Sequence, residues 1–296
     1  YWEADGVTPK GRADEIVALL ERALELDAEH PGAAHLYIHA VEASAEPERA
    51  EPYADRLGDA MPAAGHLVHM PSHIYYRVGR YIDSLEANRA AVAADERLFE
   101  EVARGDGIYA YGYYPHNVHF LLVSAQMAGA ADDALAAAEK LQRVMSDDAA
   151  ERWGWVQAIK TAPYTAHAQF SPPAAILALD DPGERFPFVR AFWHYARAIA
   201  QLRLDNAGAA ADELAAIDAI RKTTDFTALE EQFVPAGTVL TIARNVVDAR
   251  LRAAAGDVDA AVARLEEAAA LQDTVPYMEP PYWYYPVRRT LGAVLL

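Results

Sequence analysis

Helical periodicity constrains the possible folds of this 296-residue chain more than any other feature of its sequence. Apolar residues recur at the spacing of one helical face, as in Ile16, Leu19, Leu20, Ala23 and Leu24. Long alternating runs of β-branched residues and Asn-Gly hairpin turns are missing from the sequence. Ala, Leu, Glu and Arg, which are good helix formers, are abundant. The sequence therefore predicts an all-α protein.

Prolines and glycines divide this helical pattern into repeated pairs. A proline stands at or near the expected start of an aromatic or His-rich helix at Pro31, Pro71, Pro115, Pro163, Pro187, Pro235 and Pro286. Proline suits the first turn of a helix, where its missing N–H breaks no hydrogen bond. The turns before the second helices carry Gly79, Gly129, Gly208 and Gly256, and glycine can take the left-handed conformation that ends a helix. We expect about six stacked αα-hairpins and the start of a seventh.

Two of these turns resemble the tetratricopeptide repeat (TPR). In Val78-Gly79-Arg80-Tyr81-Ile82 and in Ala255-Gly256-Asp257-Val258, the small turn residue is followed twelve positions later by alanine, at Ala91 and Ala268. The units are longer than the 34 residues of that repeat, and Leu141 replaces the alanine in another unit. The resemblance extends from about residue 12. It implies one TPR-like domain over residues 1–296, a right-handed solenoid whose first helices line a concave groove.

Two further stretches are similar to a His-rich group of bacterial repeat proteins. They are His30-Pro31-Gly32-Ala33-Ala34-His35 and His69-Met70-Pro71-Ser72-His73. This resemblance implies no particular activity and carries over no catalytic residues.

Composition excludes several classes of protein. The chain has 26 Lys and Arg against 44 Asp and Glu, a formal net charge of −18. We therefore expect no nucleic-acid or membrane partner, because nucleic acids and anionic membranes both require a basic surface. Without cysteine, the chain has no disulfide, thiolate metal site or cysteine nucleophile. Any metal must be held by His, carboxylate or Tyr. Glycine-rich nucleotide-binding motifs and the G-x-S-x-G motif are also missing.

The two ends of the chain bear on its natural extent and location. It begins at Tyr1, and it ends on the apolar run Leu291-Gly292-Ala293-Val294-Leu295-Leu296. We therefore expect the natural protein to extend beyond both ends. The sequence shows no signal peptide and no apolar run of the ~18 residues that a membrane span needs. These observations favour a cytoplasmic location.

Clustered histidines are the feature that bears on function. Eight of the ten histidines lie between residues 30 and 119, where an even spread would place about three. His35 and His39 are spaced i,i+4 on a predicted helix, and Glu42 follows on the same face. A helix presents ligands to a divalent transition metal in this way. Leu36 stands where the H-E-x-x-H motif has its general base, so the chain is not predicted to be a protease of that class.

Two more groups of histidines follow. His66, His69 and His73 stand at i, i+3 and i+7, and we expect Pro71 to begin a helix, which would leave His66 and His69 in the preceding turn. His116 and His119 come directly after Pro115. If consecutive hairpins stack, these imidazoles converge across the groove. The predicted metal site consists of His35, His39, Glu42, His69, His73, His116 and His119.

Such a ligand set permits Zn, Fe, Mn, Ni or Cu, because all its donors are nitrogen and oxygen. Three or four residues would be ligands, and the others would orient them. With an open coordination position the protein would be a metalloenzyme, hydrolytic or oxidative. Two alternatives remain open at this stage. In the first, the histidines form a polar network that only holds the repeats together. In the second, the chain is a scaffold that binds a small molecule, peptide or partner protein in its concave groove.

Aromatic residues next to the third histidine group allow two interpretations. Tyr109, Tyr111, Tyr113 and Tyr114 precede the third predicted helix pair. They either pack between repeats or form an aromatic wall over the groove. The segment Gly105-Asp106-Gly107 before them would permit a mobile loop.

Overall fold

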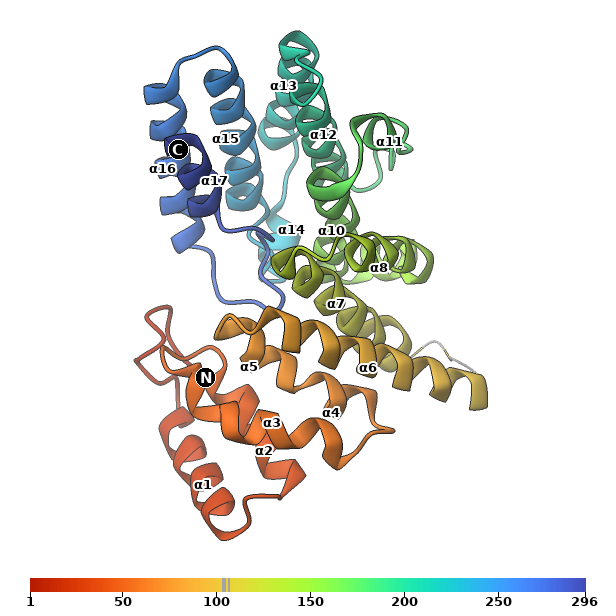
Figure 1. Ribbon diagram of the computed structural model, residues 1–296, viewed down its shortest axis with the longest axis vertical. Coiled ribbons are helices and arrows are strands. Elements are labelled where there is room, and N and C mark those ends of the chain that lie inside the picture. Colours follow the sequence, from red (N-terminus) through yellow and green to blue (C-terminus); the bar gives the residue numbers. More distant parts are fainter. Residues whose placement is uncertain (103–104, 106) are drawn as a thin grey trace. The chain divides into compact units, whose positions relative to one another are not determined.

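Every extended regular element in the described part of the chain is a helix. The computed structural model describes residues 1–102, 105 and 107–296, and Figure 1 shows the arrangement of their helices. These residues also contain one isolated β-bridge between Trp2 and Pro9. The prediction of an all-α protein is confirmed. Asp106, in the middle of the predicted mobile loop, lies outside the described residues. None of the described helices combines the length and the hydropathy that crossing a membrane requires.

Backbone contacts divide the chain into two compact units, which we call unit 1 (Tyr1–Asp133) and unit 2 (Ala134–Leu296). In both units helices pack against neighbours that are close in sequence. A single right-handed TPR-like solenoid over residues 1–296 stays a prediction.

Unit 1 contains helices of 4 to 21 residues. Its elements are α1 (Ala13–Leu26), α2 (Pro31–Val41), the 3-10 helix η1 (Pro47–Ala50), α3 (Glu51–Ala60), α4 (Gly65–His69), α5 (Pro71–Arg77), α6 (Tyr81–Glu101), the π-helix η2 (Tyr109–Tyr113) and α7 (Tyr114–Ala128). Helix α2 packs against α1, α3 and α5, and α6 packs against α4, α5 and α7. Leu24, Ile38, Leu57 and Ile74 are buried in the core where the first helices meet.

Unit 2 contains helices of 4 to 19 residues. They are most of α8 (Ala131–Val144), then α9 (Asp147–Arg152), α10 (Gly154–Phe170), α11 (Pro173–Leu177), α12 (Pro187–Leu202), α13 (Ala207–Thr223), α14 (Thr227–Glu230), α15 (Ala236–Ala254), α16 (Val258–Asp273) and α17 (Val287–Leu295). Helix α12 packs against α10, α13 and α15, and α16 packs against α15 and α17. The buried core includes Phe188, Phe192, Leu240 and Trp283.

Six of the seven predicted prolines stand at a helix start. Four occupy the first or second position of α2, α5, α7 and α12, and Pro235 and Pro286 immediately precede α15 and α17. The prediction for Pro163 is wrong, because this residue lies in the interior of α10. An internal proline costs the helix one hydrogen bond. Here the flanking residues Ala162, Tyr164 and Ala166 are buried, so packing holds the helix through this point.

Left-handed residues end the first helices of most pairs, as predicted. Gly79, Gly129 and Gly256 have φ values of 84°, 75° and 81°. The prediction for Gly208 is wrong, because Gly208 lies inside α13. Asp205, with φ 59°, takes the left-handed conformation in that turn instead. Aspartate tolerates this conformation better than most residues with a Cβ atom.

Candidate metal centre

Four helices of unit 1 bring its clustered histidines together. Helix α2 carries His35 and His39 on one face, and Glu42 directly follows its last residue. Helices α4 and α5 carry His66, His69 and His73, and α7 carries His116. Neighbouring rings meet edge to face in two of these pairs, with centroids 4.6 Å apart for His69 and His73 and 5.1 Å apart for His35 and His39.

The junction between α4 and α5 departs from the sequence prediction. His66 and His69 lie in helix α4 and not in a turn. Met70, between the two helices, has φ −51° and ψ −38°, and its N–H bonds the carbonyl of His66. Helical geometry therefore continues past Pro71, which needs no hydrogen-bond acceptor for its nitrogen. As a result His66, His69 and His73 project from nearly one face.

An inner group is formed by His69, His73 and His116. Each can offer a ring nitrogen such that the three nitrogens lie within 4.8 Å of one another. His69 and His73 are 0% and 1% exposed, and His116 is half-buried. The ring of Phe120 packs against all three imidazoles at centroid distances of 4.8–5.2 Å. This apolar wall limits how the rings can move.

Hydrogen bonds fix the orientation of two inner rings. Nδ1 of His69 lies 2.7 Å from Oδ1 of Asn88 on α6, and Nδ2 of Asn88 donates to the Ser84 carbonyl at 2.7 Å. Because a carbonyl only accepts, Oδ1 of Asn88 must face His69, whose Nδ1 is then the donor. Nδ1 of His73 likewise donates to Oε2 of Glu42. The two Nε2 atoms face each other at 2.6 Å.

An outer group is formed by His35, His39 and His66, which are all half-buried and can also offer nitrogens within 4.8 Å of one another. Nε2 of His35 lies 3.1 Å from Nε2 of His66. Nδ1 of His39 lies 2.9 Å from Oε1 of Glu42. The exposed ring of Tyr113 packs against His66 with centroids 4.7 Å apart. Of the tyrosines considered as an aromatic wall, Tyr113 thus lies against the site.

Glu42 is placed between the two groups. Its carboxylate is 3% exposed and contacts His39 through Oε1 and His73 through Oε2. His39, Glu42 and His73 also form a third combination of ligand atoms within 4.8 Å. A metal-binding histidine commonly donates its second ring N–H to a carboxylate, and the Glu42 contacts have this geometry.

Burial favours the neutral form of the rings around this site. Desolvation lowers the pKa of His66 to about 4 and holds the pKa values of His69 and His116 well below their usual range. Neighbouring histidines add to each shift, because a charged ring would repel them. The pKa of His35 is lowered for the same reasons, burial first. Neutral imidazole is the form that binds metal.

Two histidines differ from the predicted set. His119 lies on α7, buried, but belongs to none of the three combinations in the described residues, and no partner there reaches its Nδ1. Burial lowers its pKa to about 3. His66 joins the site although it is not among the seven predicted ligands. Its spacing of three and seven residues from His69 and His73 was the signal for it.

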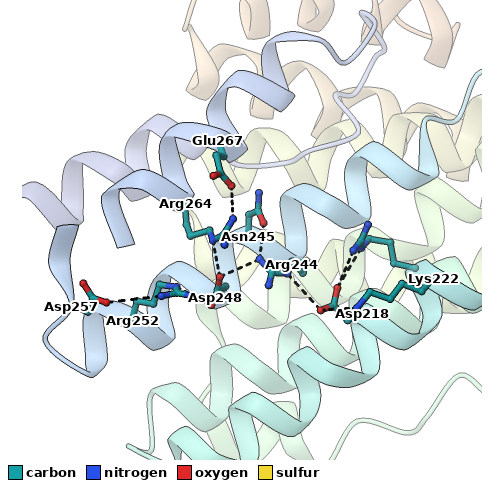
Figure 2. A network of polar contacts seen from close by, with 10 residues as sticks. Asp218, Lys222, Arg244, Asn245, Asp248, Arg252, Asp257, Arg264 and Glu267 are labelled. Atoms are coloured by element: carbon teal, nitrogen blue, oxygen red, sulfur yellow. Dashed lines mark hydrogen bonds and ion pairs between the residues drawn. The ribbon is translucent and has the colours of Figure 1, made fainter. Parts of the chain in front are cut away.

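A second polar cluster lies in unit 2 (Figure 2). Helices α13, α15 and α16 border a cavity of about 710 Å³ with the cationic residues Arg221, Lys222, Arg244 and Arg264 and the acidic residues Asp218 and Glu267. Asp248 beside it accepts from Arg244, Arg252 and Arg264 at 3.0–3.1 Å. These charges are already paired with one another. The cluster therefore has the character of a structural ion-pair network with an accessible cavity.

Comparison with known proteins gives no independent assignment. No protein-family model, no curated protein and no solved structure matches this chain. The TPR resemblance therefore stays a prediction, and any functional argument must begin from the geometry of these sites.

Proposed function

We propose that unit 1 binds a divalent transition metal ion through its histidine cluster. The inner group, His69, His73 and His116, is the observation that carries this proposal. Three imidazoles rarely share a buried space unless a cation or a network of hydrogen bonds replaces the water that their ring nitrogens lose.

The facing Nε2 atoms of His69 and His73 support a cation between them. Both rings donate from Nδ1, so a neutral ring has a lone pair on Nε2. Two lone pairs at 2.6 Å repel each other unless a proton or a metal ion lies between them. Tetrahedral zinc ligands with Zn–N bonds of about 2.05 Å lie about 3.3 Å apart, so metal binding requires only a small separation of these rings.

The donor set determines which chemistry the site would support. Nitrogen and carboxylate ligands suit Zn, Fe, Mn, Ni or Cu. Three protein nitrogens leave a coordination position for water or a substrate, as in catalytic zinc sites. A metal ion there would act as a Lewis acid or generate a nucleophile from bound water, or, if it is redox-active, support oxidative chemistry. Whether the protein is an enzyme rests on that open position.

Elemental analysis of protein purified without a histidine tag tests the proposal. We expect a stoichiometric transition metal, loss of the metal on dialysis against EDTA, and a lower melting temperature of the stripped protein. At a metal concentration of 100 Kd the stabilisation is about 2.7 kcal/mol. His69→Phe should reduce this shift, whereas His194→Phe, in unit 2, should keep it. The proposal fails if the purified protein holds no metal and neither EDTA nor added ions change its melting temperature, which would leave the histidines as a structural polar network.

A second candidate function is binding of an acidic peptide in unit 2. The observation in its favour is the cavity between α13, α15 and α16, at which the Lys222 side chain is 63% exposed although it pairs with Asp218. Fluorescence anisotropy of a labelled hexaglutamate peptide tests it. Lys222→Glu should weaken binding because Lys222 is largely exposed at the cavity, whereas Arg143→Glu, on α8, should not. No saturable binding to the unmodified protein would exclude this candidate.

A further inference from the structure

We propose that the histidine cluster is a two-metal centre, with one ion in the inner group and one in the outer group, and that Glu42 positions a ligand of each. This inference rests on the proposed metal-binding function. To that function it adds the number of ions, the separate ligands of each ion and the residue that couples the two sites.

Six histidines form two separate groups of three. His69, His73 and His116 satisfy the geometry of a three-nitrogen site, and His35, His39 and His66 satisfy it independently. No histidine belongs to both sets. A single ion would not reach all six rings, because no combination of ligand atoms within 4.8 Å in the described residues contains more than three of these histidines. One ion would therefore leave the other set of rings clustered without a cation.

The groups are adjacent. The rings of His39 and His73 have centroids 5.5 Å apart, and those of His66 and His69 have centroids 6.2 Å apart. Two divalent ions at such sites would repel each other, and a buried negative charge between them would reduce that repulsion. Glu42, 3% exposed, supplies that charge.

Glu42 acts on both groups through opposite oxygens. Oε1 accepts from Nδ1 of His39 in the outer group, and Oε2 accepts from Nδ1 of His73 in the inner group. In both rings this leaves Nε2 as the metal ligand and increases its basicity. Glu42 is thus a positioning residue for two ions at once, and it connects their affinities.

The inner site has two rings whose Nδ1 is held by a hydrogen bond, His69 and His73, whereas the outer site has one, His39. Asn88 holds Nδ1 of His69 from helix α6. In the outer group, Nδ1 of His66 is buried and no described residue lies within hydrogen-bond reach of it. We therefore expect the inner site to bind the first ion and the outer site to bind the second ion less tightly.

Cobalt titration of the full, tag-free, metal-stripped chain tests the two-metal centre. We expect visible d–d absorption to saturate at two equivalents of Co²⁺ in two phases. His116→Phe and His66→Phe, which keep an aromatic ring and remove the nitrogens, should each saturate at one equivalent. His119→Gln, on the same helix as His116, is the matched control and should retain two.

Glu42→Gln provides the test of coupling. We expect it to weaken both phases by about 10–100-fold and to shift the absorption of both ions, since a merely structural role would not change two ligand fields. Urea denaturation of each stripped variant confirms that it folds. If His66→Phe does not fold, His35→Phe replaces it, and if His116→Phe does not, the unmodified protein's stoichiometry decides.

The outcomes separate the two proposals. No cobalt binding overturns the metal-binding function and the two-metal centre together. Saturation of the unmodified protein at one equivalent keeps the function and overturns the two-metal centre. A single equivalent that Glu42→Gln abolishes would place one ion among His39, Glu42 and His73, which also overturns it.

Discussion

Gly65 and Asp95 approach so closely that a side chain at residue 65 has no room. A Cβ atom built on Gly65 would lie 1.8 Å from Oδ1 of Asp95 on helix α6. Asp95 is 0% exposed and cannot swing away, because Tyr109 and Asn117 donate to its two oxygens at 2.5 and 2.8 Å. This contact sets the position of α4, and with it His66 and His69, against α6 and α7.

We therefore predict that Gly65→Ala both destabilises the protein and weakens its metal site. Overpacking a rigid position costs about 1–3 kcal/mol, and a displaced α4 would move two histidines out of register with His73. Urea denaturation of the stripped protein and cobalt titration measure the two effects.

Gly58→Ala is the matched control for that change. Gly58 lies in α3, where a Cβ would meet Pro71 at an ordinary 3.7 Å. Alanine in a helix interior is favoured over glycine by about 0.5–1 kcal/mol, so this variant should be as stable as the parent or more stable. Equal behaviour of Gly65→Ala and Gly58→Ala would contradict the role of the Asp95 contact.

A second prediction concerns the hydrogen bond between His69 and Asn88. Asn88→Leu removes the acceptor for Nδ1 of His69, which then loses its fixed tautomer in a fully buried space. Removing such a supporting group costs about 10–100-fold in metal affinity. We expect that loss in the first, tighter phase of the cobalt titration, with little change in the second.

Ser72→Ala separates this effect from a general disturbance of the helix contact. The Ser72 hydroxyl lies 3.2 Å from the same nitrogen, a longer contact than the 2.7 Å to Asn88. Its loss should change the affinity less than Asn88→Leu does. Equal weakening of both phases by Asn88→Leu would show that Asn88 supports α6 and not the ligand.

Sequence spacing was sufficient to show which histidines share a helical face. It did not show which face of a helix meets which neighbour. In α7 nearly every residue from Tyr114 to Met127 is buried, so both sides of the helix are covered. The spacing of His116 and His119 therefore could not distinguish the ring that reaches the inner group from the one that packs elsewhere.

Predictions from proline and glycine preferences were wrong at several places in the chain. Pro71 was expected to leave His66 in a turn, but α4 and α5 continue one another because a proline at the first position of a helix needs no acceptor. The turn between α12 and α13 uses Asp205 where Gly208 was expected, three residues further along. Glycine preference indicates a turn to within a few residues, and the register of the following helix decides the rest.

The Asp205 turn leads to a third prediction, that Asp205→Gly stabilises unit 2. The left-handed conformation costs a residue with a Cβ atom about 1–2 kcal/mol more than it costs glycine. The greater flexibility of glycine in the unfolded chain offsets part of this difference. We expect a net gain of about 0.5–1 kcal/mol in the free energy of unfolding. The reverse change in the equivalent turn, Gly256→Ala at φ 81°, should cost about 1 kcal/mol. Destabilisation by Asp205→Gly in urea titrations would contradict this account.

The last prediction is that the stability of the metal-free protein depends on the buried neutral histidines as pH falls. Burial lowers the pKa of His119 to about 3 and that of His66 to about 4, whereas an unfolded histidine titrates near 6.5. Between these values the unfolded chain binds more protons than the folded one. The free energy of unfolding therefore rises with pH in this window. The stability that these histidines contribute is lost as pH falls from about 7 toward 4.

His119 allows this contribution to be measured against the background of the chain's many carboxylates. One such histidine contributes a slope of at most about 1.4 kcal/mol per pH unit below its unfolded pKa. Urea denaturation in EDTA at pH 5, 6, 7 and 8 should show a smaller slope for His119→Gln than for the parent between pH 5 and 6. The two proteins should have parallel curves between pH 7 and 8, where the histidine is neutral in both states. Parallel curves over the whole range would mean that His119 is not held neutral in the folded protein, and that its burial does not penalise its charge.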